Sequence, residues 1–298
     1  MRSRFALPLL LLLATSLTAQ TAPLMLGVLE DTHRSFTDDP YYRSVRALFY
    51  KSGSDWKPFP NNCIGESCLL QLSKDFPRET TWTIAFDARP LGEVKSRIPA
   101  EIETYSRVGQ QQILPNAYPK KFPVPTVGVR TKEFAGFMDD PVYRPLVAIS
   151  APNFKDPDLW KPTTNDAAPT ALVRAEFRRK HPKVTNCEVE EMRDYRDSEI
   201  KILKSYLAKT GWRLVATSFH GCDVDDLRGD GLNNEWFAID PSGAAHYLQA
   251  SLVLVDAGDY DNSGHSQLLF LIDDYNRGGY VLYYDNFQKE AVFDYSFH

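Results

Sequence analysis

Short apolar segments alternate with polar turns along most of the chain. Runs that are rich in branched and aromatic residues predict β-strands, because such side chains suit a half-buried sheet and the turns between them contain Gly, Pro, Asn or Asp. These runs cover residues 45–50, 81–86, 146–150, 236–239, 251–255, 268–272 and 280–284. The pattern therefore predicts an all-β fold that is mostly antiparallel.

Residues 188–207 lack Gly and Pro, and they could form a helix. Ile200 and Ile202 alternate with lysines, however, and alternation favours a strand. We therefore predict a short helix or loop here, followed by a strand. Segments 99–126 and 152–170 are rich in Pro, Gln, Asn and Thr, and we expect long loops there.

The end of the chain also alternates between apolar and polar residues. This pattern predicts that residues 291–297 form a strand in the same sheet as residues 280–284. Residues 24–29 are a candidate neighbour, because pairing between the two ends of a chain can remove an exposed sheet edge.

The N-terminal half contains a repeated segment. Residues 26–43 and 127–144 share a Gly-Val step and then Phe-x-Asp-Asp-Pro-x-Tyr-Arg, at an offset of 101 residues (Gly27 to Gly128). Each copy continues through an apolar strand to Trp-Lys-Pro, at 56–58 and 160–162, and a fainter third copy lies at 200–213. A strand, a Gly-containing turn and a second strand opened by Trp indicate a β-hairpin unit.

A second repeat lies near the C-terminus. Residues 226–240 and 259–273 each begin with an acidic, Gly-containing loop and continue into an apolar strand, at an offset of 33 residues (Asp226 to Asp259). Recurrence at this scale indicates stacked or radial repeats, because one small sheet cannot bury its own face. A β-propeller-like architecture is the first interpretation, and paired β-sandwich domains are the alternative.

These repeats predict a single β-repeat domain over residues 20–298. Its units lie near residues 26–60, 127–162, 200–240 and 251–298.

The first residues have the layout of a secretory signal peptide. Arg2 and Arg4 precede a short apolar run over residues 5–13, and a small, polar segment ends at Ala19. A membrane-spanning helix needs about 18–20 apolar residues, and no stretch of the chain reaches that length. We therefore expect residues 1–19 to be removed and the mature protein to be secreted or periplasmic, without a membrane span.

Charge and composition narrow the class of partner. The formal net charge is −5, and the densest basic stretch is residues 174–183. Nucleic-acid binding requires clustered Lys and Arg, so we do not expect it, and we interpret this stretch as a solvated face. Aromatic residues make up 12% of the chain, which agrees with a β-rich fold.

The chain contains 4 cysteines, an even number that suits two disulfides in an exported protein. Cys63 and Cys68 enclose a short loop, which closes more easily than a long one. The remaining pair is Cys187 with Cys222. A zinc site is the alternative, although no His lies at ligand spacing from either pair.

The loop 259–267 has the spacing of a calcium loop. Calcium takes about six to eight oxygen ligands, and acids at alternate positions before a turn glycine converge on one point. The candidate ligands are Asp259, Asp261, Ser263, the carbonyl group of His265, and Gln267. The upstream loop offers Asp226, Asp230 and Asn234, but it places Arg228 where a ligand is expected. The competing interpretation is that both loops are Asx-rich turns without metal.

This spacing resembles the calcium loops of FG-GAP/VCBS repeats in integrin-type β-propellers, where D-x-D/N-x-D-G-x-x-D leads into an apolar strand. The resemblance covers about residues 220–298, and Ser263 and Gln267 replace acids of the motif. It implies propeller blades and a structural Ca²⁺ ion. An EF-hand is disfavoured, because position twelve is Phe270 rather than Glu.

Catalytic signatures are missing from the sequence. It has no Gly-x-Ser-x-Gly, His-Glu-x-x-His or phosphate-loop pattern, and its histidines are scattered. We therefore expect a calcium-supported binding or interaction protein with an unknown protein or glycan partner, and leave enzymatic activity open. The alternative is a propeller-type carbohydrate-active hydrolase with paired aspartates, for which residues 38–39 and 139–140 are candidates.

Overall fold

The computed structural model describes residues 22–33, 41–87, 89–114, 122–129, 141–151, 156–164, 167–186, 191–219, 234–274 and 277–296. Helices α1 (Glu66–Asp75) and α2 (Ala167–Lys180) and short 3₁₀ turns at Tyr105–Arg107 and Asp197–Glu199 interrupt a chain of strands. Every strand pairing in these ranges is antiparallel. The all-β prediction is confirmed.

The N-terminal sheet has seven strands in the order β1-β9-β4-β5-β6-β2-β3. Their bounds are β1 (Met25–His33), β2 (Tyr41–Ser52), β3 (Asp55–Pro58), β4 (Glu79–Phe86), β5 (Arg89–Arg97), β6 (Gln110–Ile113) and β9 (Leu146–Ile149). Strand β1 also pairs with β2, so the pairings return to their starting strand. Strand β3 extends beyond this circuit, and the sheet is neither a clear barrel nor a clear propeller blade.

Two further sheets follow along the chain. The α2 sheet, with the order β10-β13-β14-β15-β16, contains β10 (Lys161–Pro162), β13 (Ile200–Leu207), β14 (Arg213–Phe219), β15 (Asn234–Ile239) and β16 (Ala245–Ala250). The C-terminal sheet contains β17 (Leu252–Gly258), β18 (Gln267–Asp274), β19 (Arg277–Tyr284) and β20 (Lys289–Ser296), in that order. Short ribbons pair β7 (Thr126–Val129) with β8 (Pro141–Tyr143) and β11 (Val184–Asn186) with β12 (Glu191–Arg193).

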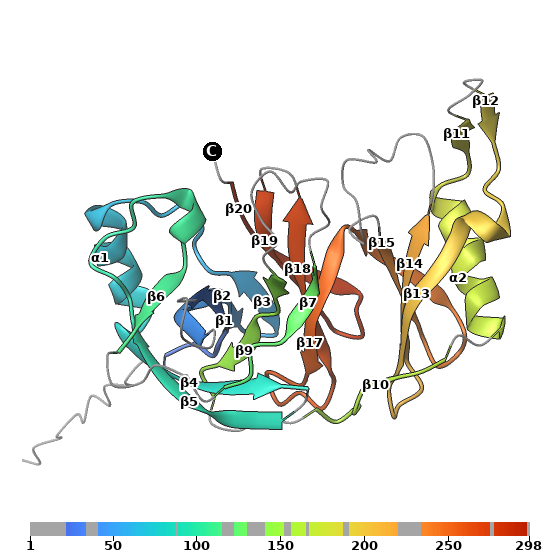
Figure 1. The fold of residues 1–298 in the computed structure, drawn as a ribbon. Helices are drawn as coiled ribbons and strands as arrows, with labels where there is room; N and C mark the ends of the chain where they lie inside the picture. Colours follow the sequence, from blue (N-terminus) through green and yellow to red (C-terminus); the bar gives the residue numbers. More distant parts are fainter. Residues whose placement is uncertain are drawn as a thin grey trace, which may run out of the picture.

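The C-terminal sheet lies between the other two sheets (Figure 1). On one face, Phe270 packs against Trp236 of the α2 sheet, with ring centroids 5.1 Å apart. On the other face, Leu269 and Tyr280 belong to the core shared with the N-terminal sheet. Successive side chains of a strand point to opposite faces, so burial of both faces explains why residues 268–272 are apolar without interruption.

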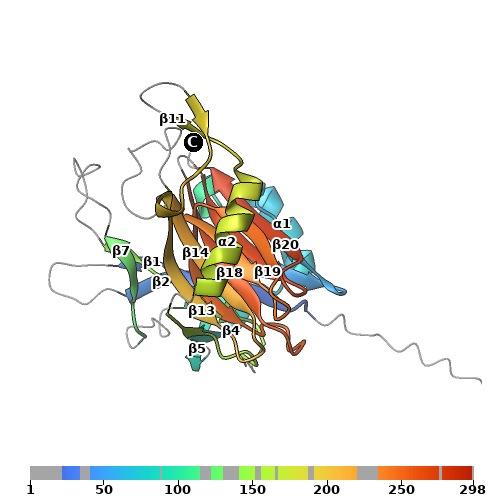
Figure 2. The same ribbon diagram turned by 90° about the vertical axis from the view of Figure 1, so that its right-hand side faces the viewer.

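Helix α2 covers the outer face of the α2 sheet (Figure 2). Val173 and Phe177, one helical turn apart, are buried there against Val215 and Phe237. The expectation of an irregular loop over 152–170 is wrong at its end, because α2 begins at Ala167. The prediction for 188–207 is confirmed for the 3₁₀ turn at Asp197–Glu199 and strand β13, but it is wrong at residues 191–193, which form strand β12 and pair with β11.

The two copies of the N-terminal repeat share one hairpin and then diverge. Strands β1 and β2 pair in the first copy, as β7 and β8 do in the second. The repeated glycine is required in the first copy, since a Cβ atom at Gly27 would lie 2.3 Å from the carbonyl oxygen of Arg46. In the second copy Pro145 separates β8 from β9, because proline has no N–H group for the ladder. Strand β9 then pairs with β1 and β4 instead.

Two local predictions can be checked in this fold. Strand β20 pairs with β19, so the C-terminal strand is confirmed as far as Ser296, but β1 lies in the N-terminal sheet rather than beside it. Cys63 and Cys68 form a disulfide, as their spacing predicts. The second predicted pair, Cys187 with Cys222, lies outside the described residues.

Candidate functional site

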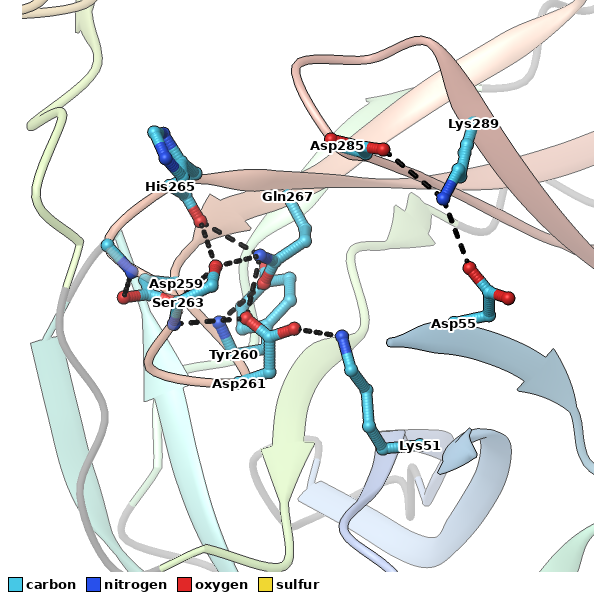
Figure 3. Close-up of polar contacts among 11 residues, drawn as sticks. Lys51, Asp55, Asp259, Tyr260, Asp261, Ser263, His265, Gln267, Asp285 and Lys289 are labelled. Carbon is cyan, nitrogen blue, oxygen red and sulfur yellow. Dashed lines mark hydrogen bonds and ion pairs between the residues drawn. The ribbon is translucent and has the colours of Figure 1, made fainter. Parts of the chain in front are cut away.

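The loop 259–267 joins β17 to β18 and brings the predicted oxygen ligands together (Figure 3). The loop is closed at its base by pairing of Gly258 with Gln267. Asn262 and Gly264 adopt left-handed backbone angles, with φ of 55° and 86°, which reverses the chain sharply.

The Asp259 carboxylate serves the backbone of its own loop. Its two oxygens accept hydrogen bonds of 2.8 Å from the N–H groups of Ser263 and Gly264. Burial raises the pKa of Asp259, and these hydrogen bonds only partly oppose that effect. Asp259 is therefore a structural acceptor that holds the turn in shape.

Gln267 points its amide nitrogen into the centre of the loop. Its Oε1 atom accepts a hydrogen bond of 2.7 Å from the Tyr260 N–H group, which fixes the orientation of the amide. Its Nε2 atom donates to Asp261 Oδ1 at 3.0 Å and to the His265 carbonyl oxygen at 2.8 Å, and it lies 3.3 Å from Ser263 Oγ. Gln267 therefore donates hydrogen bonds to Asp261 and to the His265 carbonyl group, although the sequence predicts that all three bind the same calcium ion.

Lys51 reaches the same loop from the N-terminal sheet. Its ammonium group forms an ion pair with Asp261 Oδ2, and the two side chains are 22% and 6% exposed. The ammonium also lies 5.1 Å from the centre of the Trp56 ring. Burial raises the pKa of Asp261, but the hydrogen bond and charge of Lys51, together with hydrogen bonds to Ser263 and Asp259, outweigh burial and hold that pKa below its usual value.

The arrangement fits a calcium ion poorly. Gln267 turns nitrogen rather than oxygen towards the other candidate ligands, and one oxygen of Asp261 is engaged by an ammonium group. Among the described residues no group of three or more His, Cys, Asp or Glu side chains is placed to hold a metal ion. Calcium binding by this loop stays a prediction.

The second predicted metal loop can be followed only at its end. Asp226, Arg228 and Asp230 lie outside the described residues, as do the aspartates at 38–39 and 139–140. Asn234 begins β15, where its side-chain oxygen accepts a hydrogen bond of 3.2 Å from the Leu252 N–H group. This hydrogen bond links the α2 sheet to the first strand of the C-terminal sheet.

Two buried acids behind the loop were not anticipated from the sequence. Ser266 donates its hydroxyl group to Asp156 Oδ1 at 2.8 Å and its N–H group to Asp158 Oδ2 at 3.3 Å. The Thr210 hydroxyl group donates to Asp158 at 2.7 Å. These contacts tie the loop to the segment before β10 and to the turn between β13 and β14.

A second cluster of ionisable groups lies beneath α2, and no sequence motif marks it. His181 Nε2 lies 2.6 Å from Glu235 Oε1, and the Glu235 side chain is 1% exposed. Neither the second oxygen, Oε2, nor His181 Nε2 itself has a hydrogen-bond partner among the described residues, so the two side chains lie close together without an aligned hydrogen bond. Burial raises the pKa of Glu235 to about 7, although the positive charge of Lys180 opposes this, whereas burial lowers the pKa of His181.

Aromatic rings surround this pair. The imidazole of His181 stacks on Phe219 with centroids 6.0 Å apart, and it meets Phe177 at 4.9 Å. Tyr247 of β16 completes the group at 6.4 Å, with the Lys180 ammonium 4.9 Å from its ring centre. In these surroundings burial disfavours the charged forms of both the carboxyl group and the imidazole.

Comparison of the chain with protein-family models, with curated proteins and with solved structures gave no match. In the part of the chain that the structure describes, no helix is long and apolar enough to cross a bilayer.

Proposed function

We propose that this chain is an exported binding or interaction protein, in which the packed sheets form a rigid scaffold for a protein or glycan partner. The observation that supports this proposal is that charged and polar side chains form hydrogen bonds and ion pairs between the sheets. A surface that is already fixed binds a partner with a smaller loss of conformational freedom than a mobile surface does.

Several of these contacts join the N-terminal sheet, or the loop that follows β3, to the C-terminal sheet. Besides the Lys51–Asp261 pair, Tyr280 donates its hydroxyl group to Glu30 Oε2 at 3.0 Å. Asn61 donates its amide to the Asp294 carbonyl oxygen at 2.7 Å. Partly buried polar contacts of this kind specify one arrangement of the sheets, because leaving any of the groups unpaired is unfavourable.

We also propose that the protein is exported and that its sheets are arranged like the blades of a β-propeller. The signal-peptide pattern of residues 1–19 supports export, and the Cys63–Cys68 disulfide suits an oxidising compartment. The C-terminal sheet supports the propeller-like interpretation, since it has four strands in sequence order and is buried on both faces, like a blade between two neighbours.

The proposal is tested by measuring binding and turnover on the same panel of ligands. The purified protein is applied to immobilised glycans and polysaccharides, and the same compounds are assayed for the release of new reducing ends. Saturable binding without any product supports the binding function. Steady release of product from a bound glycan contradicts it and favours the hydrolase alternative.

One observation favours an enzyme as the second candidate. A buried carboxylic acid beside an imidazole, as in Glu235 and His181, is an arrangement that general acid–base catalysis uses. If product release is found in that panel, Glu235→Gln should abolish it while leaving glycan binding intact. Unchanged turnover in this variant excludes the pair as the catalytic centre.

A further inference from the structure

We propose that the loop 259–267 is a binding site for a primary ammonium group, and that Lys51 of the same chain fills it. The Lys51 ammonium and the Gln267 amide together take the place that a calcium ion has in loops of this spacing. The inference is independent of the proposed binding function, because it concerns how the loop is neutralised and not which partner the protein binds.

The first support is the geometry of Gln267. Its Nε2 atom lies within 2.8 to 3.3 Å of the His265 carbonyl oxygen, Asp261 Oδ1 and Ser263 Oγ (Figure 3). These atoms belong to three of the groups that the spacing assigns to a metal. The Tyr260 N–H group holds the amide in this orientation, since it must face an acceptor, and Oε1 of Gln267 supplies that acceptor.

The second support is the placement of Lys51. It stands near the end of β2, where its N–H group donates to the Leu24 carbonyl oxygen at 2.8 Å. The side chain crosses to the C-terminal sheet, passes the Trp56 ring and ends at Asp261 Oδ2. With Asp261 only 6% exposed, the ion pair is shielded from water, and it is therefore stronger than a surface pair.

The third support is the charge of the loop. Calcium loops use several carboxylates because each divalent ion must be neutralised, but here neutral Ser263 and Gln267 occupy two of the positions where the resembled motif has acids. Asp259 is committed to backbone N–H groups. The Asp261 carboxylate is left to pair with an ammonium group, whose three N–H donors can face oxygen or aromatic partners.

The test compares thermal unfolding of the wild type, Lys51→Met and Lys57→Met, each with about 5 mM Ca²⁺ or with a chelator. Lys57 is the matched control, because it is an exposed lysine on the adjacent strand β3. We expect Lys51→Met to lower the Tm by several degrees and Lys57→Met to leave it unchanged. We also expect the wild-type Tm to be the same with Ca²⁺ as with the chelator.

A fourth protein, Lys51→Met/Gln267→Asp, converts the site towards calcium. It removes both nitrogen donors and adds a third acid to the loop, so its Tm should rise with Ca²⁺ and fall again with the chelator. Failure of this response, or equal Tm values for Lys51→Met and Lys57→Met, overturns the proposal.

If Lys51→Met fails to fold, a Ca²⁺ titration of the wild-type protein still tests the proposal. A wild-type Tm that rises with Ca²⁺, but not in Asp261→Asn, would mean that the loop binds the metal directly, and this overturns the proposal. An unchanged wild-type Tm across the Ca²⁺ titration supports it.

Discussion

The loop 259–267 and the pair beneath α2 both bury carboxyl groups, but they satisfy them in different ways. Asp261 is met by the Lys51 ammonium and the Gln267 amide, and its pKa lies below the usual value. One oxygen of Glu235 lies 2.6 Å from His181 Nε2, the other has no hydrogen-bond partner among the described residues, and burial raises the pKa of Glu235 to about 7. Burial by itself therefore does not fix the charge of a carboxyl group, because the number and charge of its partners decide it.

The contrast also separates two roles for buried acids in this fold. Asp261, which pairs with a cation from another sheet, links the two sheets and keeps its charge. A partly partnered acid is less stable when charged, which makes its site responsive to pH.

The largest effect is expected for Asp259→Ala. The variant leaves the N–H groups of Ser263 and Gly264 without their acceptors in a partly buried loop, which should lower the free energy of unfolding by about 2–3 kcal/mol. Denaturant unfolding measures the change, with Asp55→Ala, a half-exposed aspartate at the start of β3, as control. If both variants lose the same stability, the loop is not held by Asp259.

Glu235→Gln should change the pH dependence of stability. The folded-state pKa, about 7, lies above the ordinary 4.5, so protonated Glu235 contributes its stability fully below pH 4.5 and loses it as the pH rises through about 7. At pH 8 the variant should be more stable than the wild type, because Gln does not ionise and so does not lose this stability.

Unfolding from pH 5 to pH 8 checks this expectation. Because the pKa of His181 is lowered, its own contribution is lost towards acidic pH, so the comparison near pH 7 and above reports on Glu235. Glu93→Gln, at an exposed position on β5, is the matched control. A wild-type profile that remains in Glu235→Gln would show that Glu235 does not titrate in this range.

Ser266→Ala tests the acids that lie behind the loop. The variant removes the hydroxyl donor to Asp156, a buried carboxyl group, and should lower the free energy of unfolding by about 1 kcal/mol. Ser73→Ala on the exposed face of α1 serves as control. Equal stability of the two variants would mean that the hydrogen bond between Ser266 and Asp156 does not stabilise the fold.

The smallest effect is expected for Lys289→Ala. Lys289 lies 3.2 Å from both Asp55 and Asp285 (Figure 3), but the three side chains are 47%, 49% and 57% exposed. Water and salt screen such pairs, so the Tm should not change measurably. A loss as large as that of Lys51→Met would mean that burial does not distinguish the two lysines.

The strands could be predicted because their apolar pattern is continuous and local. Residues 268–272 and 280–284 form β18 and β19 as expected, and the alternation of residues 291–297 identifies β20. Helix α2 was missed because Val173 and Phe177 are its only fully buried apolar side chains, too few for a clear helical period. In the second repeat copy, Pro145 redirected β9 to other partners, which a repeat offset cannot reveal.

The candidate site was predictable only within one loop. The spacing of Asp259, Asp261 and Gln267 brings their side chains together, and the structure places them so. Lys51 could not be found this way, because it is 210 residues from Asp261 and reaches it only through packing of two sheets. Glu235 stands in an apolar strand, where neither spacing nor composition marks its contact with His181.

The most direct measurement of the central claim is the reactivity of Lys51 in the native protein. Brief labelling with an amine-specific acylating reagent, followed by peptide mass spectrometry, compares Lys51 with exposed Lys57 in the same molecule. An ammonium held by Asp261 must leave its partner before it reacts, so we predict that Lys51 labels much more slowly than Lys57, with or without Ca²⁺. Equal labelling of the two lysines, or release of Lys51 by Ca²⁺, would contradict the account.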